Sequence, residues 1–581
     1  MTGHVYQPEE IFAPETKAGI IAQLWDSWNT QRQSWMEEKK EMRNFLFATD
    51  TSKTSVGGLP WKNSTTLPKL TQIRDNLHAN YLSAVFPNDN WLKWEAYSAD
   101  AAVAAKREAI TAYMSNKTRE DKFMTEISRL LYDYIDYGNA FADVHFVRET
   151  KIDVNTGEEI PQYIGPRLER IHPFNIVFNP LAETFDKSPK IVRKLKNLGE
   201  LKKDAEEQPN NVALQTAVAK AEELRRTSTT TAKEDTDMWN DMHVDGFGSY
   251  SEYLKSGMIE ILEFEGDFFN TDTMTLESNK RITIADRAIV LEDGDMEQWL
   301  GSSKVHVGWR TRPENLWAMG PLDNLVGMQY RIDHLENLKA DVFDLIAYPP
   351  LKIMGEVEDF TWGPNEEIHI DEGGDVQFLA PPAQALNADT QIALLEQRME
   401  EYAGAPKQAM GIRTPGEKTA FEVQQLQNAA GRIFQNKINS FEVNLMEPIL
   451  NNMLEVARRN MDLVDTVRVM DDDLGVIEFM SVTKEDITAA GKLRPIGSRH
   501  FAAQAQLIQN LTQLFNSQVG QLVMPNVSTN ELTKLVEDAL QLERFDLFSE
   551  NAQLFEQAER QQVAGQLQEE MAVQQAQPPV V

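Results

Sequence analysis

The sequence predicts a multi-domain protein of the α+β class that is predominantly helical. The chain has 581 residues, which is more than one hydrophobic core normally organises, so we expect two to four domains. Hydrophobic residues make up 41% of the chain, enough for burial to offset chain entropy. Apolar residues recur at helical spacing over most of the sequence, with shorter segments typical of strands between them.

Composition excludes several classes of function. The formal net charge is -33, from 57 basic and 90 acidic residues, whereas a protein that grips DNA phosphates over a broad face is basic. Two interpretations stay open, an ordinary acidic surface or a surface that must not adhere to DNA. There is no cysteine, which excludes disulfides and thiolate metal sites. No apolar run of about 18 residues occurs, which predicts no membrane span.

The first part of the chain is predicted to be helical. Residues 17–48 show an amphipathic helical period, and a second helix holds the apolar positions from Leu70 to Val85. A third helix covers about 120–137, and Gly138 is a plausible stop.

The periodicity then changes to that of strands. We expect strands at 140–147 and 170–180, the second bounded by prolines. Residues 196–235 are charged and poor in large apolar side chains, which indicates an exposed helical insertion. Further strands are predicted at 258–269, 281–291 and 303–310.

The segment 320–350 is the clearest helix. Gly320-Pro321 opens it and Pro349-Pro350 stops it, because proline fits the first turn but cannot continue a helix. Its apolar stripe is narrow and its other positions are charged, which suits lateral packing against similar helices. A helix buried on one side within its own subunit fits the same pattern.

A short α/β region and further helices follow. Strands are predicted at 351–357, 366–370 and 375–381, a helix at about 388–402, and a breaker-rich loop at 404–417. Next we predict a helix over 418–460 that bends at Pro448, strands at 466–470 and 475–482, and helices from 501 onward.

The sequence contains no motif with a clear catalytic or metal-binding spacing. Its nine histidines form no HExxH pair, and no GxSxG turn occurs. The segment "GIRTPGEKT" is close to a phosphate-binding loop, but Glu417 separates the glycine from the lysine and no strand precedes it. The acidic run Asp471-Asp472-Asp473 lacks the alternation of a calcium loop. We therefore expect no enzyme, no metal and no cofactor.

Three segments, in this order, resemble a known family. They are "YGNAFADVHF" (137–146) with "LERIHPFNIVFNP" (168–180), "RTRPENLWAMGPLDNLVGMQYRIDHLENLKADVFDLIAYPPLKI" (310–353), and "YAGAPKQAMGIRTPGEKTAFEVQQLQ" (402–427). The pattern is similar to that of portal proteins of tailed bacteriophages, especially the short-tailed type. The resemblance covers roughly 120–500.

The resemblance implies a ring-forming architecture of wing, stem, clip and crown. Its segments would be 1–320 as the wing with the insertion at 196–235, 321–348 as the first stem helix, 349–386 as the clip, 387–403 as the second stem helix, 404–417 as the tunnel loop, 418–500 as the long helix and return to the wing, and 501–581 as the helical crown and tail.

The family implies a function and a set of partners. Portal proteins form twelve-subunit rings at a capsid vertex of the virion, through which DNA is packaged and ejected. The expected partners are further copies of the chain, double-stranded DNA without sequence specificity, the major capsid protein, the terminase and a tail adaptor, with no membrane. A different virion structural protein, such as a scaffold or tail component, and a carboxylate-dependent hydrolase remain alternatives.

Three sets of residues are candidates for function. The loop at 404–418 is locally basic and would contact phosphates without reading bases, unless its charges are ordinary solvated ones. Acidic residues of the stem helix would line the channel if they face it, and aromatic residues of the clip would dock the adaptor unless they pack inside the clip. The candidates are Lys407, Arg413 and Lys418 for the loop, Asp333, Glu336, Asp341 and Asp344 for the channel, and Phe360 and Trp362 for docking.

Overall fold

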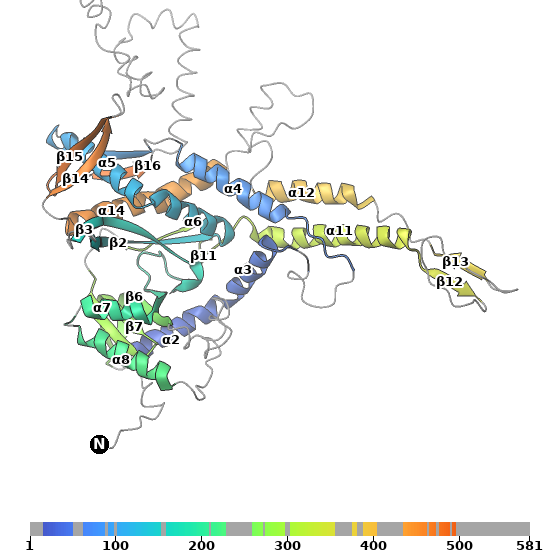
Figure 1. The fold of residues 1–581 in the computed structure, drawn as a ribbon, viewed down its shortest axis with the longest axis horizontal. Coiled ribbons are helices and arrows are strands. Elements are labelled where there is room, and N and C mark those ends of the chain that lie inside the picture. The colour runs from blue at the N-terminus through green and yellow to red at the C-terminus, as the bar shows by residue number, and fades with distance from the viewer. Residues whose placement is uncertain are drawn as a thin grey trace, which may run out of the picture. The chain divides into compact units, whose positions relative to one another are not determined.

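The structure is a computed structural model of the whole chain (Figure 1). It divides into two compact units, 1–83 with 118–460, and 84–117 with 461–581. It describes residues 16–49, 51, 62–87, 91–97, 101–152, 159–207, 209, 211–227, 258–270, 273–296, 303–354, 375–379, 387–403, 434–461, 464–471, 476–488 and 491–495.

A five-stranded antiparallel sheet organises part of the first unit. Its order is β4-β5-β6-β7-β8, and every neighbouring pair is antiparallel. Its strands are β4 (Ile176–Phe178), β5 (Lys190–Asn197), β6 (Met258–Asn270), β7 (Thr275–Ala285) and β8 (Ile289–Asp295).

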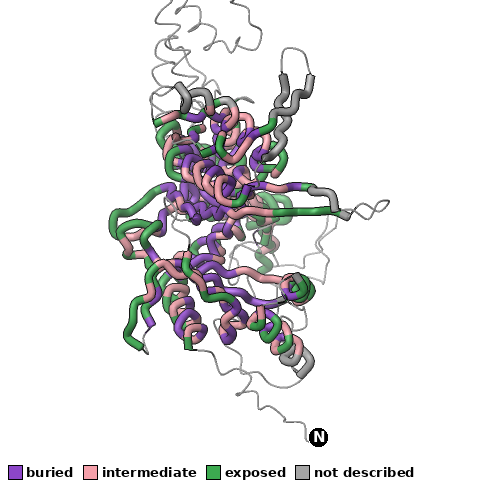
Figure 2. The backbone as a smooth tube through the Cα atoms, turned by 90° about the vertical axis from the view of Figure 1, so that its left-hand side faces the viewer, coloured by how far each residue is buried: buried purple, intermediate pink, exposed green. Residues whose placement is uncertain are grey.

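Helices cover both faces of this sheet. Side chains alternate along a strand, so Leu262 and Phe264 of β6 pack with α2 (Thr16–Gln31), while Ile259 and Ile261 pack on the other face. That face is covered by α7 (Leu198–Glu207) and α8 (Val212–Thr227). Buried segments follow the strands and the helices that face them (Figure 2).

The insertion predicted at 196–235 contains the helices α7 and α8, and its residues after 227 lie outside the described residues. For α7 and α8 the prediction of an exposed insertion was wrong. Leu201, Ala205, Leu214, Ala217 and Ala221 are buried in the core on this face of the sheet. Three of these five are alanines. Because alanine is small, the lack of large apolar residues in this segment did not indicate that α7 and α8 have a buried apolar face.

A second sheet of the first unit has the order β3-β2-β9. Helix α6 (Phe123–Asp136) leads into it through Gly138, which has a left-handed φ of +71°. A Cβ at Gly138 would lie 2.4 Å from the backbone nitrogen of Gly320, so only glycine fits both the turn and this contact. The strands are β2 (Asn139–Ile152), β3 (Glu159–Ile171) and β9 (Val305–Gly308).

Other elements of the first unit complete its core. The structure describes the helix predicted around Pro448 from residue 434 onward, and it runs to 460. A π-helical turn at Glu442–Met446 lies just before Pro448, which has no N–H to donate. The remaining elements are α3 (Gln33–Leu46), η2 (Pro173–Asn175), β10 (Arg310–Arg312), β11 (Asn315–Met319) and α14 (Glu447–Asn460).

Two helices and a hairpin form the region that was predicted as stem and clip. A 3-10 turn, η3 (Asp323–Leu325), precedes α11 (Val326–Ala347), and α12 (Asp389–Ala403) packs alongside α11. Beyond the C-terminal end of α11, strands β12 (Leu351–Met354) and β13 (Asp375–Phe378) pair as an antiparallel hairpin (Figure 1).

The second unit contains two antiparallel strand pairs. In the first, Gly491 opposes Ala96, and a Cβ at Gly491 would lie 2.2 Å from the ring of buried Trp94. The pairs are β1 (Leu92–Ala96) with β16 (Gly491–Pro495), and β14 (Val464–Asp471) with β15 (Val476–Thr483). Helices α4 (Lys69–Val85) and α5 (Ala101–Glu120) each span a boundary between the units.

The prediction of a predominantly helical fold was wrong. Of the described residues, 52% are helical and 30% lie in strands, so the fold is mixed. We underestimated the strand content because some strands are longer than predicted and others are rich in charged residues. β2 and β3 are 14 and 13 residues long, whereas we predicted only 140–147 and the end of β3, and β5 carries four Lys and Arg residues among its eight. The predicted helices from 501 onward lie outside the described residues.

Candidate functional site

Five of the nine predicted site residues lie outside the described residues. These are Lys407, Arg413 and Lys418 of the loop, and Phe360 and Trp362 of the clip. The four acidic candidates lie on α11, and their surroundings define a site that the sequence did not predict.

One face of α11 binds the main chain of an extended segment. Gln329, Asp333, Asn337 and Asp341 are each four residues apart, so they share one side of the helix. Their oxygens accept hydrogen bonds from backbone N–H groups within 62–70. The distances are 3.0 Å from Leu70 to Gln329, 3.0 Å from Leu67 to Asp333, 2.8 Å from Thr65 to Asn337, and 2.9 Å from Lys62 to Asp341.

The same face also donates hydrogen bonds to this main chain. The amide of Asn337 donates to the carbonyl of Thr65 at 2.8 Å, and that of Gln329 donates to the carbonyl of Leu67. Gln329, Asp333 and Asn337 are buried, with 2% or less of each exposed. Buried polar groups that keep their partners fix the geometry, because losing one partner leaves the other unsatisfied.

Asp333 is the buried charge of this site. Burial raises its pKa, and the hydrogen bonds from the Leu67 N–H, the Thr66 hydroxyl and the Gln329 amide act in the opposite direction. These three donors hold the buried Asp333 carboxylate in place on this face.

The acidic candidates of α11 are therefore engaged within the chain. Asp333 is buried, and Asp341 and Asp344 both accept hydrogen bonds from the side chain of Asn63. Glu336 pairs with Lys339 at 2.8 Å. The sequence showed these charges but not their partner segment, which precedes them by more than 260 residues.

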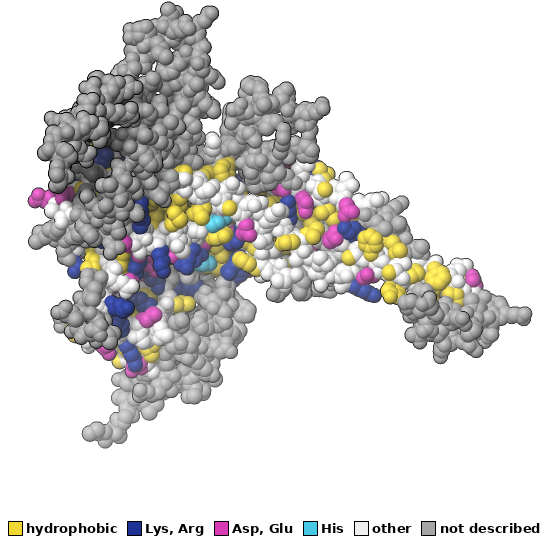
Figure 3. Space-filling view, turned by 45° about the horizontal axis from the view of Figure 1, so that its top comes forward, with side chains coloured by type: hydrophobic (Ala, Val, Ile, Leu, Met, Phe, Trp, Pro, Cys, Tyr) yellow, Lys and Arg dark blue, Asp and Glu magenta, His cyan; other side chains and the backbone are white. Residues whose placement is uncertain are grey.

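The end of α11 has a different character. Every residue from Phe343 to Tyr348 is exposed. Six consecutive residues exceed one helical turn, so exposure extends around the whole helix rather than along one face. Figure 3 shows hydrophobic side chains on this end of the helix and on the hairpin. The exposed apolar side chains are Phe343, Leu345, Ile346 and Tyr348 on the helix and its end, and Ile353, Met354, Phe378 and Leu379 on and beside the hairpin.

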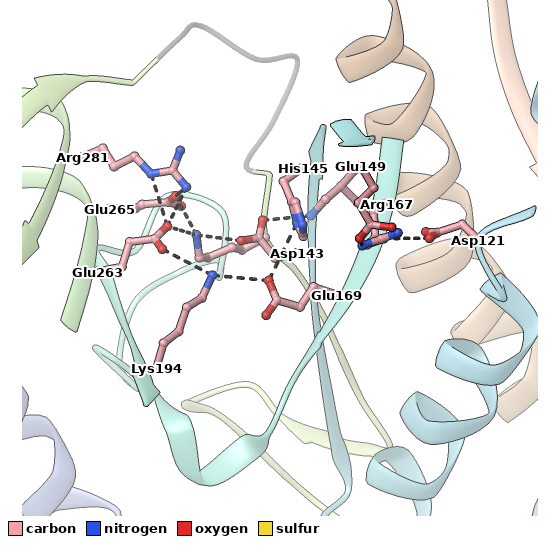
Figure 4. Close-up of polar contacts among 12 residues, drawn as sticks. Asp121, Asp143, His145, Glu149, Arg167, Glu169, Lys194, Glu263, Glu265 and Arg281 are labelled. Carbon is pink, nitrogen blue, oxygen red and sulfur yellow. Dashed lines mark hydrogen bonds and ion pairs between the residues drawn. The ribbon is translucent and has the colours of Figure 1, made fainter. Parts of the chain in front are cut away.

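A second polar cluster joins the five-stranded sheet to the β3-β2-β9 sheet (Figure 4). Lys304, just before β9, is fully buried, and its ammonium contacts Asp143 of β2 at 3.2 Å. It also contacts Glu263 at 3.0 Å and Glu265 at 2.6 Å, both on β6. Arg281 of β7 pairs with Glu263 at 2.7 Å. One ammonium therefore holds three carboxylates from two sheets.

The charges of this cluster shift one another. Burial opposes ionisation of Glu263, yet Lys304, Lys194 and Arg281 hold its pKa well below the usual value. For Glu265 burial prevails over the cations and raises the pKa. Burial lowers the pKa of Lys190 to about 8, against the attraction of Glu265. One oxygen of Glu265 has no hydrogen-bond partner among the described residues.

Next to this cluster, a groove of about 850 Å³ lies between the start of α6 and strands β2 and β3. Its charges bind one another, since Arg167 pairs with Asp121 at 2.7 Å and also with Glu149 (Figure 4). His145 lies 3.8 Å from Glu169 on the same wall. The groove is polar, but its arginines are already occupied by carboxylates.

These clusters give no arrangement for catalysis. The carboxylates of Asp143, Glu263 and Glu265 are bound to the buried ammonium of Lys304. The Ser128 hydroxyl lies 3.0 Å from His78 Nε2, but the same nitrogen lies 3.1 Å from the Ser128 carbonyl oxygen, so this pair is a contact local to one residue. Within the described ranges, no group of three or more His, Asp or Glu side chains could hold a metal ion. Among the helices in the same ranges, none is long and apolar enough to cross a membrane.

No family model matches the chain, and a search of curated proteins returns no match. The proposals below depend on the residues and contacts of this chain and on the resemblance described above.

Proposed function

We propose that this chain is the subunit of a phage-type portal, a ring of twelve copies at a capsid vertex through which double-stranded DNA enters and leaves. The ring would dock the packaging terminase and a tail adaptor, contact the major capsid protein, and carry no enzymatic activity. The proposal concerns a structural component of the virion that assembles without a cofactor.

The observation that carries the proposal is the exposed apolar end of α11 with its hairpin. Contiguous apolar surface of this kind marks an interaction site in soluble proteins. Because the exposure extends around the helix, a single partner on one side would leave the other side uncovered. A copy with a neighbour on each side has both sides covered, which is the geometry of a closed head-to-tail ring.

The order of elements also supports the proposal. A long helix, a small hairpin and a returning helix follow one another at 326–403, as stem, clip and stem would. The net charge of -33 suits a channel that DNA must traverse without adhering. The basic residues Lys407, Arg413 and Lys418 would supply weak phosphate contacts at the channel loop.

The alternatives receive less support. A carboxylate-dependent hydrolase needs an accessible acid and base, whereas Asp143, Glu263 and Glu265 are buried on one lysine. A scaffold or other tail component has no need of a helix pair that ends in a hairpin.

Negative-stain microscopy of the purified chain tests the proposal. We expect closed rings with a central channel. An extended assembly would favour another structural protein, and a compact single-copy particle would favour the enzyme; either result contradicts the portal assignment.

The loop is tested separately in rings that have formed. Reversing Lys407 and Arg413 to Glu should leave rings intact but reduce DNA packaging or retention, because phosphate contacts are lost. Normal packaging by such rings would show that the loop has no role in DNA contact.

A further inference from the structure

The helix pair α11–α12 is fastened to the start of α4 at two separate points. The first is the extended segment 62–70, whose main chain binds the polar face of α11. The second is an ion pair between Lys69 and Glu400 of α12, at 2.7 Å, in which both side chains are buried. Lys69 and Leu70 are the first two residues of α4, so the two attachments meet at one helix end.

The first attachment recognises main chain rather than side chains. Five backbone N–H groups and two backbone carbonyls within 62–70 bond to α11, and only Asn63 and Thr66 add side-chain bonds to α11. Ser64 and Thr65 keep exposed side chains although their main chain lies against the helix. Because α11 both accepts from and donates to this main chain, over about three turns from Gln329 to Asp341, the segment cannot slide by one residue without breaking the set.

We propose that residues 62–70 form a main-chain clamp that joins α4, α11 and α12 into one body. Opening it would leave the buried groups of Gln329, Asp333 and Asn337 without partners, and separating α12 would leave Glu400 and Lys69 as buried, uncompensated charges. The clamp therefore stays closed while the protein works. Movement of this region is confined to the exposed end of α11 and the hairpin, beyond Asp344. This inference does not depend on the portal assignment, since it concerns contacts within one chain.

Hydrogen–deuterium exchange of the full chain tests the clamp, with Asn337→Ala as the variant. The substitution removes both bonds to Thr65 but leaves the Lys69–Glu400 pair untouched. We expect exchange to become about tenfold faster in 62–70 and also faster in α12, because the three helices share the clamp. Glu336→Ala is the matched control, because Glu336 is one residue away and pairs with Lys339 of its own helix rather than with 62–70. Strands β5 to β7 serve as the internal reference and should keep their protection.

Faster exchange at 62–70 with α12 unchanged would overturn the coupling, and no change at 62–70 would overturn the clamp itself.

A second test does not depend on weakening the fold. The chain has no cysteine, so Thr66→Cys with Asp333→Cys introduces a single thiol pair at two side chains that face each other, with Thr66 Oγ1 2.9 Å from Asp333 Oδ2. Oxidation should cross-link the pair and restore slow exchange in α12, and reduction should reverse this. Failure to cross-link, or a cross-link that leaves α12 fast, contradicts the proposal.

Discussion

The charge cluster around Lys304 and the exposed end of α11 differ in whether their side chains have partners within the chain. Around Lys304, three carboxylates are buried and each meets a cation from the same chain. At the end of α11, Phe343, Leu345 and Ile346 are apolar and nothing in the same chain covers them within the described residues. The first region is complete in one copy, whereas we propose that a neighbouring copy covers the second. Substitutions in the first should therefore change folding stability, and those in the second should change assembly.

Lys304→Met should have the largest effect on stability. It removes the cation and leaves Asp143, Glu263 and Glu265 buried together, which should lower the free energy of unfolding by about 3–5 kcal/mol. Urea denaturation measures the change. Lys196→Met, at the half-buried pair with Asp204, is the control and should cost less than about 1 kcal/mol. Equal losses in the two variants would show that the buried cluster has no special role.

Asp333→Ala should come next. It leaves the Leu67 N–H and the Gln329 amide without their acceptor, and should lower the free energy of unfolding by about 1–3 kcal/mol. Glu336→Ala on the same helix should change it by less than about 0.5 kcal/mol. If Glu336→Ala lowered the free energy of unfolding as much as Asp333→Ala does, the hydrogen bonds between α11 and 62–70 would not be the cause of the loss.

The third prediction concerns pH and His306, whose Nε2 donates to the side-chain oxygen of Asn139 and whose ring stacks on Phe141. Burial and Lys190 lower the pKa of His306 to about 3, below its ordinary value near 6.5. The unfolded chain therefore binds a proton that the folded chain does not, and stability is lost as pH falls from 6.5 toward 3. Each pH unit in this window should cost about 1.4 kcal/mol for this histidine. His306→Asn should reduce the slope of unfolding free energy against pH by the equivalent of about one proton. An unchanged slope would contradict the claim that His306 causes this loss.

The smallest effect on stability is expected at the end of α11. Phe343→Ser combined with Ile346→Ser removes side chains that a single copy already exposes, so unfolding of the separated subunit should change by less than about 0.5 kcal/mol. A loss above about 2 kcal/mol in the separated subunit would mean that these residues pack within their own chain. The comparison between the two regions would then fail.

The sequence predicted local elements better than it predicted partners. The helix expected at 321–348 runs over 326–347, and the strands predicted at 351–357 and 375–381 and the returning helix are present, because prolines and helical spacing mark them locally. The strand predicted at 366–370 lies outside the described residues. The helical class was wrong, since long charged strands such as β5 do not show simple alternation.

The polar face of α11 was missed for a different reason. Gln329, Asp333, Asn337 and Asp341 recur every four residues, and this amide and carboxylate stripe was the available signal. Its partner lies in 62–70, and nothing local to the helix indicates it. Lys304 was missed in the same way, because its three carboxylates come from two other strands.

The mass of the assembled protein in solution tests the central claim most directly. Light scattering of the wild-type chain should give a particle close to twelve times the 66.0 kDa of one copy. The Phe343→Ser and Ile346→Ser double variant should shift toward the single-copy mass, whereas Leu181→Ser, at an exposed leucine elsewhere, should not. A wild-type mass near 66.0 kDa under all salt conditions, or a double variant that assembles as the wild type does, would contradict the account.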